Sequence, residues 1–566
     1  MLQIATGKLF RQGVLKRNTL RGVLYTNLRM FGEEKIVTMA GQLLGVHALR
    51  KLHGHSLVYE IVELIEGDVI APGVMSSFGI DRYLNDFAAV ASFFLQITCN
   101  PDYDLVRRLT NGQSGLATNC APKFLIKNVF ESDIFISETD SLAFVEFVRQ
   151  LVGLQRRTFN VVMGAIRTYV TAMHRTSDDL ELSYTLLVAS LESLAQKFDA
   201  HQATWLDLAD ESRCRIDSAL STAPAEIANA VRDAVLKNEH VKLSRRFKEF
   251  SLENLPEEFF LGDAEGKHRP IGRQDLVDGL SEAYQIRSAY VHNLKSLPHL
   301  LVRSTNFAET VSVDRKTVLT FQGLSRVVRS VIIEFVRRQP SVDAEHYPYQ
   351  LETGSIVTGR WAASVWMANL DNLKPDVGRQ WLEGFLEQLE VYYRDPKSAK
   401  FTDIRTAMEM IEPLLPTMKA ASRLPFLTIY TAFNNLFVPE ERNANAQAVI
   451  ERWGHIFDTP SIEALFLHSI ATLPTWDIAE HAHVLDTHIG SRSKRSGYHF
   501  PRLFDASMSL QLVERYRLEG GLEEAARRLK LASENFPEYP RMRARALEGD
   551  LTHPILWKTL LLENQE

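Results

Sequence analysis

Hydrophobic and polar positions alternate along the first third of the chain, and apolar residues recur every three or four positions thereafter. Short runs rich in β-branched and aromatic residues predict strands near residues 9–15, 21–28, 35–39, 56–65 and 124–130. A polar Lys-Arg-Asn-Thr turn separates the first two, and a helical stripe over residues 81–98 interrupts the series. We therefore expect residues 1–135 to form a β-rich α+β domain.

From about residue 137 the pattern is helical, with helices predicted near residues 139–173, 177–200, 224–238, 275–295 and 317–338. The segment 177–200 has the clearest apolar stripe, and Thr176 or Ser177 can cap its start. Glu192 lies at the edge of this stripe, where a solvated flank is expected; a place near an active centre is the alternative. Residues 136–340 are accordingly predicted to form a helical domain.

Beyond residue 340 the pattern stays helical to the end, with segments near 375–394, 400–413, 421–436, 441–456 and 500–535. Residues 516–532 resemble a tetratricopeptide-type helical hairpin, although no clean 34-residue period precedes them. We expect residues 341–566 to be an all-α, helical-repeat-like scaffold that binds a protein partner or dimerises. The predicted fold class is α+β multidomain.

Composition narrows the function classes. Apolar residues make up 45% and charged residues 24% of the 566 positions, as in globular proteins, and the formal net charge of −6 gives the whole chain no attraction for nucleic acid. Cys99, Cys120 and Cys214 have no zinc-type spacing, and His481, His483 and His488 do not converge on one helix face, so no metal or cofactor is expected. The absence of an 18-residue apolar run predicts a cytoplasmic protein without a membrane segment.

Candidate chemistry is concentrated in residues 284–293, which read Tyr-Gln-Ile-Arg-Ser-Ala-Tyr-Val-His-Asn. Leu276, Leu280, Ala283, Val291 and Leu294 form the apolar stripe of this predicted helix, and Arg287 falls on the same stripe and needs a partner there. His292 lies about 140° away around an ideal helix. Either the helix unwinds after Tyr290 or a second copy of the chain completes the site.

The pair Arg287 and His292, with Tyr284 before it and Asn293 after it, resembles the Arg-x4-6-His motif of the HEPN superfamily, and the bacterial Apea-like branch most of all. An upstream helix reading Leu-Leu-Val-Ala-Ser-Leu-Glu-Ser-Leu, which contains Glu192, adds to the resemblance over residues 140–340. The resemblance implies a composite endoribonuclease site formed by two protomers without a metal, in which Arg287 and His292 are catalytic. The residue after the arginine is often a larger polar one in active members and is Ser288 here.

These residue types suit RNA cleavage. RNA supplies its own nucleophile, the 2′-hydroxyl, so a histidine that titrates near neutral pH and an arginine that donates to phosphate oxygens are sufficient. Such a reaction leaves a 2′,3′-cyclic phosphate and a 5′-hydroxyl. The expected function is thus a homodimeric, metal-independent endoribonuclease, which the resemblance connects with toxins and defence effectors.

Positive side chains that would contact RNA are scattered. Arg245, Arg246 and Lys248 lie within one short stretch, and Arg326, Arg329, Arg337 and Arg338 follow a later helix; either set is a candidate RNA contact or a solvated face. The competing interpretation is a non-catalytic HEPN-type protein that dimerises and senses a ligand or partner. In that case Arg287 binds a core carboxylate and His292 simply ends a helix.

Overall fold

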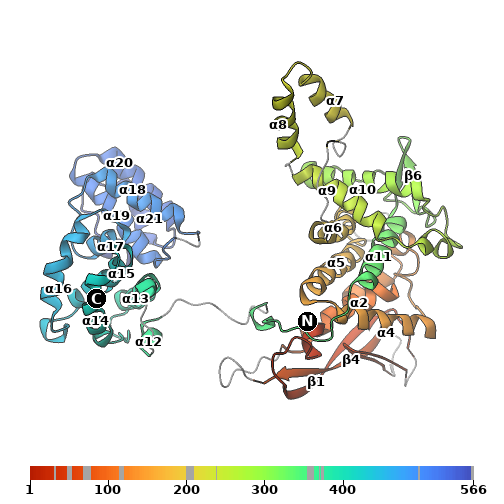
Figure 1. Cartoon of the computed structure of the whole chain (residues 1–566), viewed down its shortest axis with the longest axis horizontal. Coiled ribbons are helices and arrows are strands. Elements are labelled where there is room, and N and C mark those ends of the chain that lie inside the picture. Colours follow the sequence, from red (N-terminus) through yellow and green to blue (C-terminus); the bar gives the residue numbers. More distant parts are fainter. Residues whose placement is uncertain are drawn as a thin grey trace. The chain divides into compact units, whose positions relative to one another are not determined.

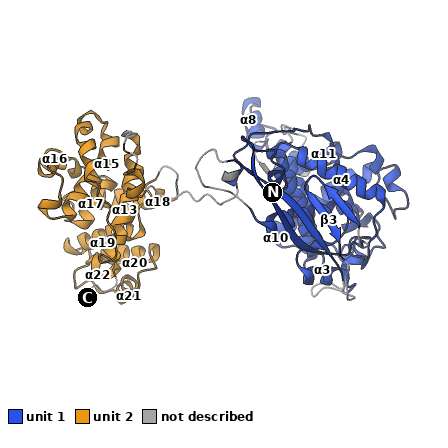
Figure 2. Cartoon of the chain, turned by 90° about the horizontal axis from the view of Figure 1, so that it is seen from below, with its two compact units in different colours: residues 1–356 blue, residues 357–566 orange. Residues whose placement is uncertain are grey.

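The computed structural model describes residues 1–30, 34–46, 54–67, 78–113, 120–198, 205, 210–236, 239–352, 362–368, 370, 375–494 and 497–562. The chain divides into two compact units, Met1–Ile356 (unit 1) and Val357–Glu566 (unit 2), which Figure 1 shows along the sequence and Figure 2 in two colours. Unit 1 is mixed α+β and begins with a small antiparallel sheet, whereas the described residues of unit 2 contain no strand. The coarse prediction of an α+β chain is confirmed.

The sheet of unit 1 is antiparallel, with the order β2-β3-β4-β1-β5. Its strands are β1 (Val14–Thr26), β2 (Lys35–Thr38), β3 (Gly41–Gly45), β4 (His55–Glu66) and β5 (Cys99–Asn100). The predicted turn at Lys16 to Thr19 was wrong, because these residues continue β1 and pair with β4, for example Arg17 with Leu64. Paired backbone groups on a neighbouring strand outweigh a weak local turn signal that contains no Gly or Pro.

Helix α2 (Ile80–Leu95) packs on the sheet. The ring of Tyr59 on β4 stacks on Phe87 of α2 with centroids 4.5 Å apart. Gly22 of β1 lies under the same helix, where a Cβ atom would stand 3.0 Å from Leu84. This close approach of helix to sheet explains a glycine inside the strand.

Residues 124–130 were predicted to be a strand, and this was wrong. The segment starts with the 3-10 turn Pro122–Phe124 and continues as a turn in which Asn128 has φ +75°. Its apolar residues Leu125, Ile126, Val129 and Phe130 are buried nonetheless. A short apolar run signals burial, but it does not distinguish a strand from a packed loop.

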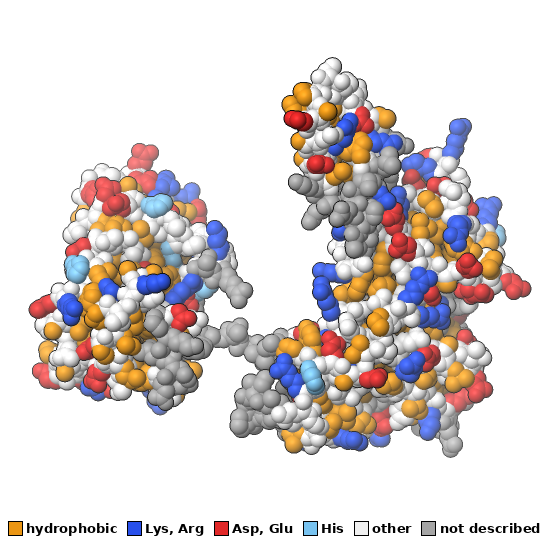
Figure 3. All heavy atoms as spheres, viewed as in Figure 1, with side chains coloured by type: hydrophobic (Ala, Val, Ile, Leu, Met, Phe, Trp, Pro, Cys, Tyr) orange, Lys and Arg blue, Asp and Glu red, His pale blue; other side chains and the backbone are white. Residues whose placement is uncertain are grey.

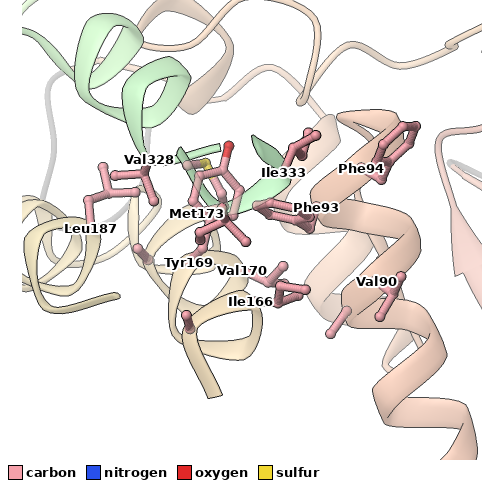
Figure 4. Close-up of a cluster of buried hydrophobic side chains, with 14 of the residues drawn as sticks. Val90, Phe93, Phe94, Ile166, Tyr169, Val170, Met173, Leu187, Val328 and Ile333 are labelled. Carbon is pink, nitrogen blue, oxygen red and sulfur yellow. The ribbon is translucent and has the colours of Figure 1, made fainter. Parts of the chain in front are cut away.

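Four helices form the centre of unit 1: α4 (Glu138–Gly153), α5 (Arg156–Arg175), α6 (Leu180–Phe198) and α11 (Phe321–Arg338). Figure 4 shows side chains of α2, α5, α6 and α11 meeting in one apolar cluster, in which the ring of Phe93 meets that of Tyr169 edge-on at 5.2 Å. The single helix predicted over 139–173 is interrupted at Leu154 and Gln155. There the Lys8 ammonium donates to the carbonyls of Val152, Gly153 and Leu154 at 2.6 to 2.9 Å, which satisfies the end of α4.

The start of α6 differs from the prediction. Asp179, rather than Thr176 or Ser177, accepts a hydrogen bond from the backbone N–H of Leu182 at 2.8 Å. Thr176 instead donates to the carbonyl of Met173 in the preceding helix. A carboxylate next to free N–H groups is also favoured by the helix dipole.

Further helices and a hairpin complete unit 1. They are α1 (Leu2–Ala5), α3 (Tyr103–Thr110), α7 (Asp210–Ala219), α8 (Ala225–Leu236), α9 (Glu239–Glu253), α10 (Arg273–Asn293) and the hairpin of β6 (Thr310–Val313) and β7 (Lys316–Leu319). β7 occupies the start of the helix predicted over 317–338, and α11 begins after it. Sequence patterns missed this hairpin because its turn is built on Asp314 and Arg315 at positive φ rather than on glycine.

The boundaries that we placed at residues 135/136 and 340/341 lie inside unit 1. One hydrophobic core continues from the sheet into the helices. Residues 341–352 fold back on the start of the chain, where the N–H of Tyr347 donates to the carbonyl of Leu9 at 3.3 Å. Arg156 of α5 pairs with Glu352 at 2.7 Å.

Unit 2 is built from helices around its own core. They are α12 (Ala363–Trp366), α13 (Gly378–Arg394), α14 (Arg405–Ile411), α15 (Ala420–Leu436), α16 (Ala446–Trp453), α17 (Ile462–Ile470), α18 (Ile478–Ser491), α19 (Arg502–Leu518), α20 (Leu522–Asn535), α21 (Pro540–Glu548) and α22 (Trp557–Leu561). The predicted segment 500–535 is a helical hairpin that turns at Gly520, whose φ is +82°. His481 and His488 are buried and His483 is exposed, so these histidines do not converge.

Candidate functional site

Arg287 and His292 lie on α10, a 21-residue helix that stays helical to Asn293. Leu294 follows in the left-handed region at φ +51°, its N–H donates to the carbonyl of Tyr290, and the N–H of Lys295 donates to that of Ala289. This pair of hydrogen bonds is the usual way in which a helix ends. The helix therefore does not unwind after Tyr290, and the first of our two explanations for convergence was wrong.

The partner of Arg287 is Glu192 on α6. Arg287 Nη2 lies 2.8 Å from Glu192 Oε2, and the two side chains are 22% and 5% exposed. The expectation that Glu192 is a solvated flank residue was wrong, because α10 packs against α6 and covers it. A guanidinium and a carboxylate that share a buried face stabilise each other against the cost of leaving water.

Tyr284, one turn before Arg287, belongs to the same cluster. Its ring centroid lies 5.8 Å from the Arg287 guanidinium carbon. Burial, followed by the negative charge of Glu192, raises the pKa of the Tyr284 hydroxyl, so it stays protonated at neutral pH. Glu192 Oε1 and Arg287 Nε have no hydrogen-bond partner among the described residues. Both atoms are buried, so the cluster is closed around the Arg287 and Glu192 pair.

His292 and Asn293 are exposed on the last turn of α10, and Ser288 is half-buried. The helix keeps Arg287 and His292 on different faces, so one chain does not bring them together. Val291 and Leu294, which we predicted to be buried with Leu276, Leu280 and Ala283, are instead 48% and 78% exposed. The stripe is thus buried in the first part of α10 and open to solvent around His292.

The three residues of α9 that we predicted to contact RNA are half-buried rather than fully exposed. Arg245, Arg246 and Lys248 lie on a helix whose Phe247 and Phe250 are buried against the rest of unit 1, with Phe247 5.8 Å from the ring of Tyr284. Arg245 pairs with Glu249 at 2.7 Å. The stretch lies next to the Arg287 cluster, although part of its charge is neutralised locally.

Two of the arginines on α11 point inward and are structural. Arg326 pairs with the buried Glu309 at 2.7 Å, and Arg329 donates to the carbonyls of Phe93 and Phe94 at the end of α2. Burial lowers the pKa of Arg329. These side chains tie helices together, so the interpretation of Arg326 and Arg329 as a solvated or RNA-facing set was wrong.

The cavity of about 760 Å³ between α2, α4 and α11 lies away from α10. Carboxylates from several segments line it, including Glu131, Glu258, Asp263 and Glu334, and they outnumber its two arginines, Arg329 and Arg337. Carboxylates repel phosphate groups, so this cavity does not suit RNA. Within the described part of the chain, no group of three or more His, Cys, Asp or Glu side chains could hold a metal ion.

The chain matches no protein-family model, no curated protein and no solved structure. None of the helices formed by the described residues is long and apolar enough to span a bilayer.

Proposed function

We propose that the protein is a metal-independent endoribonuclease of HEPN type, in which Arg287 of one copy and His292 of a second copy form a composite site. The observation that carries the proposal is the arginine held on a buried helix face by Glu192, five residues before an exposed histidine. Arg287 would stabilise the developing charge on the phosphorane, and His292 would transfer the proton. Tyr284, Ser288, Asn293 and Glu192 would support the site.

The second copy is favoured by the end of α10. Val291 and Leu294 expose apolar surface on the last turns, beside His292. Exposed apolar side chains that follow a core-like pattern are typical of protein interfaces. A two-fold contact across this end would cover them and bring the histidine of each copy toward the other copy. The proposed homodimer thus accounts for both the open stripe and the separation of the two catalytic residues.

A second candidate function is a non-catalytic interaction or sensor protein. It is favoured by the Glu192 carboxylate, which already neutralises Arg287. Under this alternative Arg287 is a structural arginine, RNA is not cleaved, and unit 2 binds a protein partner.

The test is cleavage of total RNA in EDTA by the wild-type protein, His292→Ala, and His483→Ala as an exposed-histidine control in unit 2. We expect the wild type and the control to leave 2′,3′-cyclic phosphates and 5′-hydroxyls, and His292→Ala to lose cleavage. Mixing His292→Ala with Arg287→Ala should restore about a quarter of the activity, since half of the dimers would be mixed and each would hold one intact site. Absence of cleavage by all variants would favour the non-catalytic alternative.

A further inference from the structure

Residues 283–308, which form the second half of α10 and the segment after it, contain no Asp or Glu. Lys295, His299 and Arg303 recur within this segment at intervals of four residues, and all three are exposed. Leu297 and Leu301 alternate with them and are 7% and 1% exposed. The segment is therefore anchored by its leucines and presents its basic side chains outward.

The segment runs back along α10 from its last turn to its first. Near its start, the N–H of Leu297 donates to Glu181 of α6. At its end, the N–H of Glu309 donates to the carbonyl of His268, and the N–H of Ile271 donates to the Glu309 carboxylate at 3.0 Å, just before α10 begins. Twenty-one helical residues span about 31 Å, so the segment returns over a comparable length.

A second acid-free stretch, residues 266–274, continues the basic surface. It carries Lys267, His268 and Arg269, all exposed. The imidazole of His268 lies 3.1 Å from the carbonyl of Asn306, which places this stretch beside the end of the 294–309 segment. We call Lys267, Arg269, Lys295, His299 and Arg303 the basic strip.

Some acidic groups around the strip are bound within the protein, whereas Glu265 and Asp275, at either side of residues 266–274, are exposed. Glu309 is fully buried and paired with Arg326. Asp179 and Glu181 accept hydrogen bonds from the backbone N–H groups of Leu182 and Leu297. Among the described residues, no ion pair joins the five strip residues to a carboxylate. Figure 3 shows Lys and Arg side chains, with acidic ones among them, over the part of unit 1 where Figure 1 places α10 and β6.

We propose that the basic strip binds the phosphate backbone of RNA and leads it along α10 to the end that carries His292. This inference rests on the proposed ribonuclease function. Exposed Lys and Arg side chains without local partners attract phosphates and release their counterions, which supplies sequence-independent affinity. A net charge of −6 makes such a local strip necessary for RNA binding.

The test measures RNA binding by the full chain in the His292→Ala background, with a labelled single-stranded RNA at several salt concentrations. The strip variant carries Arg269→Gln, Lys295→Gln and Arg303→Gln. The control carries Lys397→Gln, Lys400→Gln and Lys419→Gln, three exposed lysines of unit 2 that remove the same charge. Loss of three phosphate contacts should weaken binding and reduce the slope of log affinity against log salt by about 2. The control should bind as its parent does.

Other outcomes separate this inference from the proposed function. If the strip variant and its parent show the same slope of log affinity against log salt, the strip does not bind RNA. This would hold even if the protein with an intact His292 cleaves RNA. A smaller slope for the strip variant, together with no RNA cleavage by the protein with an intact His292, would support RNA binding by the strip. The same result would count against the proposed ribonuclease activity. If the strip variant loses binding to anionic lipid vesicles but binds RNA as its parent does, the strip contacts a membrane surface. It would then not be an RNA-binding site. Circular dichroism melting checks that the variants are folded.

Discussion

At the residue scale, the ion pair of Arg287 and Glu192 is the most consequential contact of the candidate site. Its carboxylate is almost fully buried, and Glu192 Oε1 and Arg287 Nε have no hydrogen-bond partner among the described residues. Removing one member of such a pair leaves the other charge buried and uncompensated, whereas removing both abolishes both desolvation costs. The pair should therefore be strongly coupled.

We expect Glu192→Gln to lower the free energy of unfolding of unit 1 by about 2 kcal/mol. Adding Arg287→Met should recover part of that loss, since the uncompensated guanidinium disappears. Urea unfolding of both single variants and the double variant measures the coupling. As a control, Glu146→Gln breaks the exposed pair of Glu146 with Arg149 and should have no measurable effect. Additive losses at 192 and 287 would contradict the coupling.

At the element scale, the start of α11 depends on one glycine. Thr320 caps the helix by accepting from the N–H of Gly323 at 3.1 Å and donates to the carbonyl of Ala308 at 2.6 Å. This draws the helix so close to Glu309 that a Cβ atom on Gly323 would stand 2.1 Å from the Glu309 carbonyl oxygen. Glu309 in turn binds Arg326 and the N–H of Ile271, so the cap joins α11 to the segment that precedes α10.

Gly323→Ala should consequently destabilise unit 1 by about 2 kcal/mol, because either the helix or the Glu309 backbone must move. Gly164→Ala in the middle of α5 is the matched control, since a Cβ atom there meets nothing within 4 Å. That variant should gain up to about 1 kcal/mol from helix propensity alone. Thermal melts of the two variants beside the wild type test the difference in sign. If both substitutions stabilise the protein, the backbone at Gly323 and Glu309 can move apart without cost.

At the scale of the whole molecule, each unit has its own large hydrophobic core among the described residues, and unit 1 has in addition a small cluster around Phe10 and Tyr349. The stacked indoles of Trp366 and Trp381, 4.2 Å apart, belong to the core of unit 2. Six of the seven tryptophans lie in the sequence of unit 2, and all three cysteines lie in unit 1. Tryptophan fluorescence therefore reports mainly on unit 2, and reactivity of the buried Cys99 and Cys120 reports on unit 1.

Phe385→Ala, which empties a fully buried site in unit 2, should cost that unit about 3 to 5 kcal/mol. The urea midpoint followed by tryptophan fluorescence should fall, while the midpoint for labelling of Cys99 and Cys120 should stay unchanged. Phe159→Ala, at an equally buried site of unit 1, should produce the opposite pattern. A common shift of both midpoints in either variant would mean that the units unfold as one.

The sequence by itself determined the elements with strong periodicity and the candidate residues Arg287 and His292. Local spacing predicts the helices α2, α6, α10 and α15 and the long strand β4, because apolar periodicity reflects which face of an element is covered. The same spacing places Arg287 on a buried face, where it needs a partner. The spacing of Arg287 and His292 was likewise recognised from the sequence alone.

Only the tertiary structure decided which distant residues each face of a helix or strand contacts. It paired Arg287 with Glu192, extended β1 through a polar stretch, turned Arg326 and Arg329 inward, and left Val291 and Leu294 exposed beside His292. These outcomes depend on segments far apart in the chain, and the residues near a position do not encode which distant partner will cover it. A charged or apolar side chain becomes structural or functional according to whether another element, or another molecule, removes it from water.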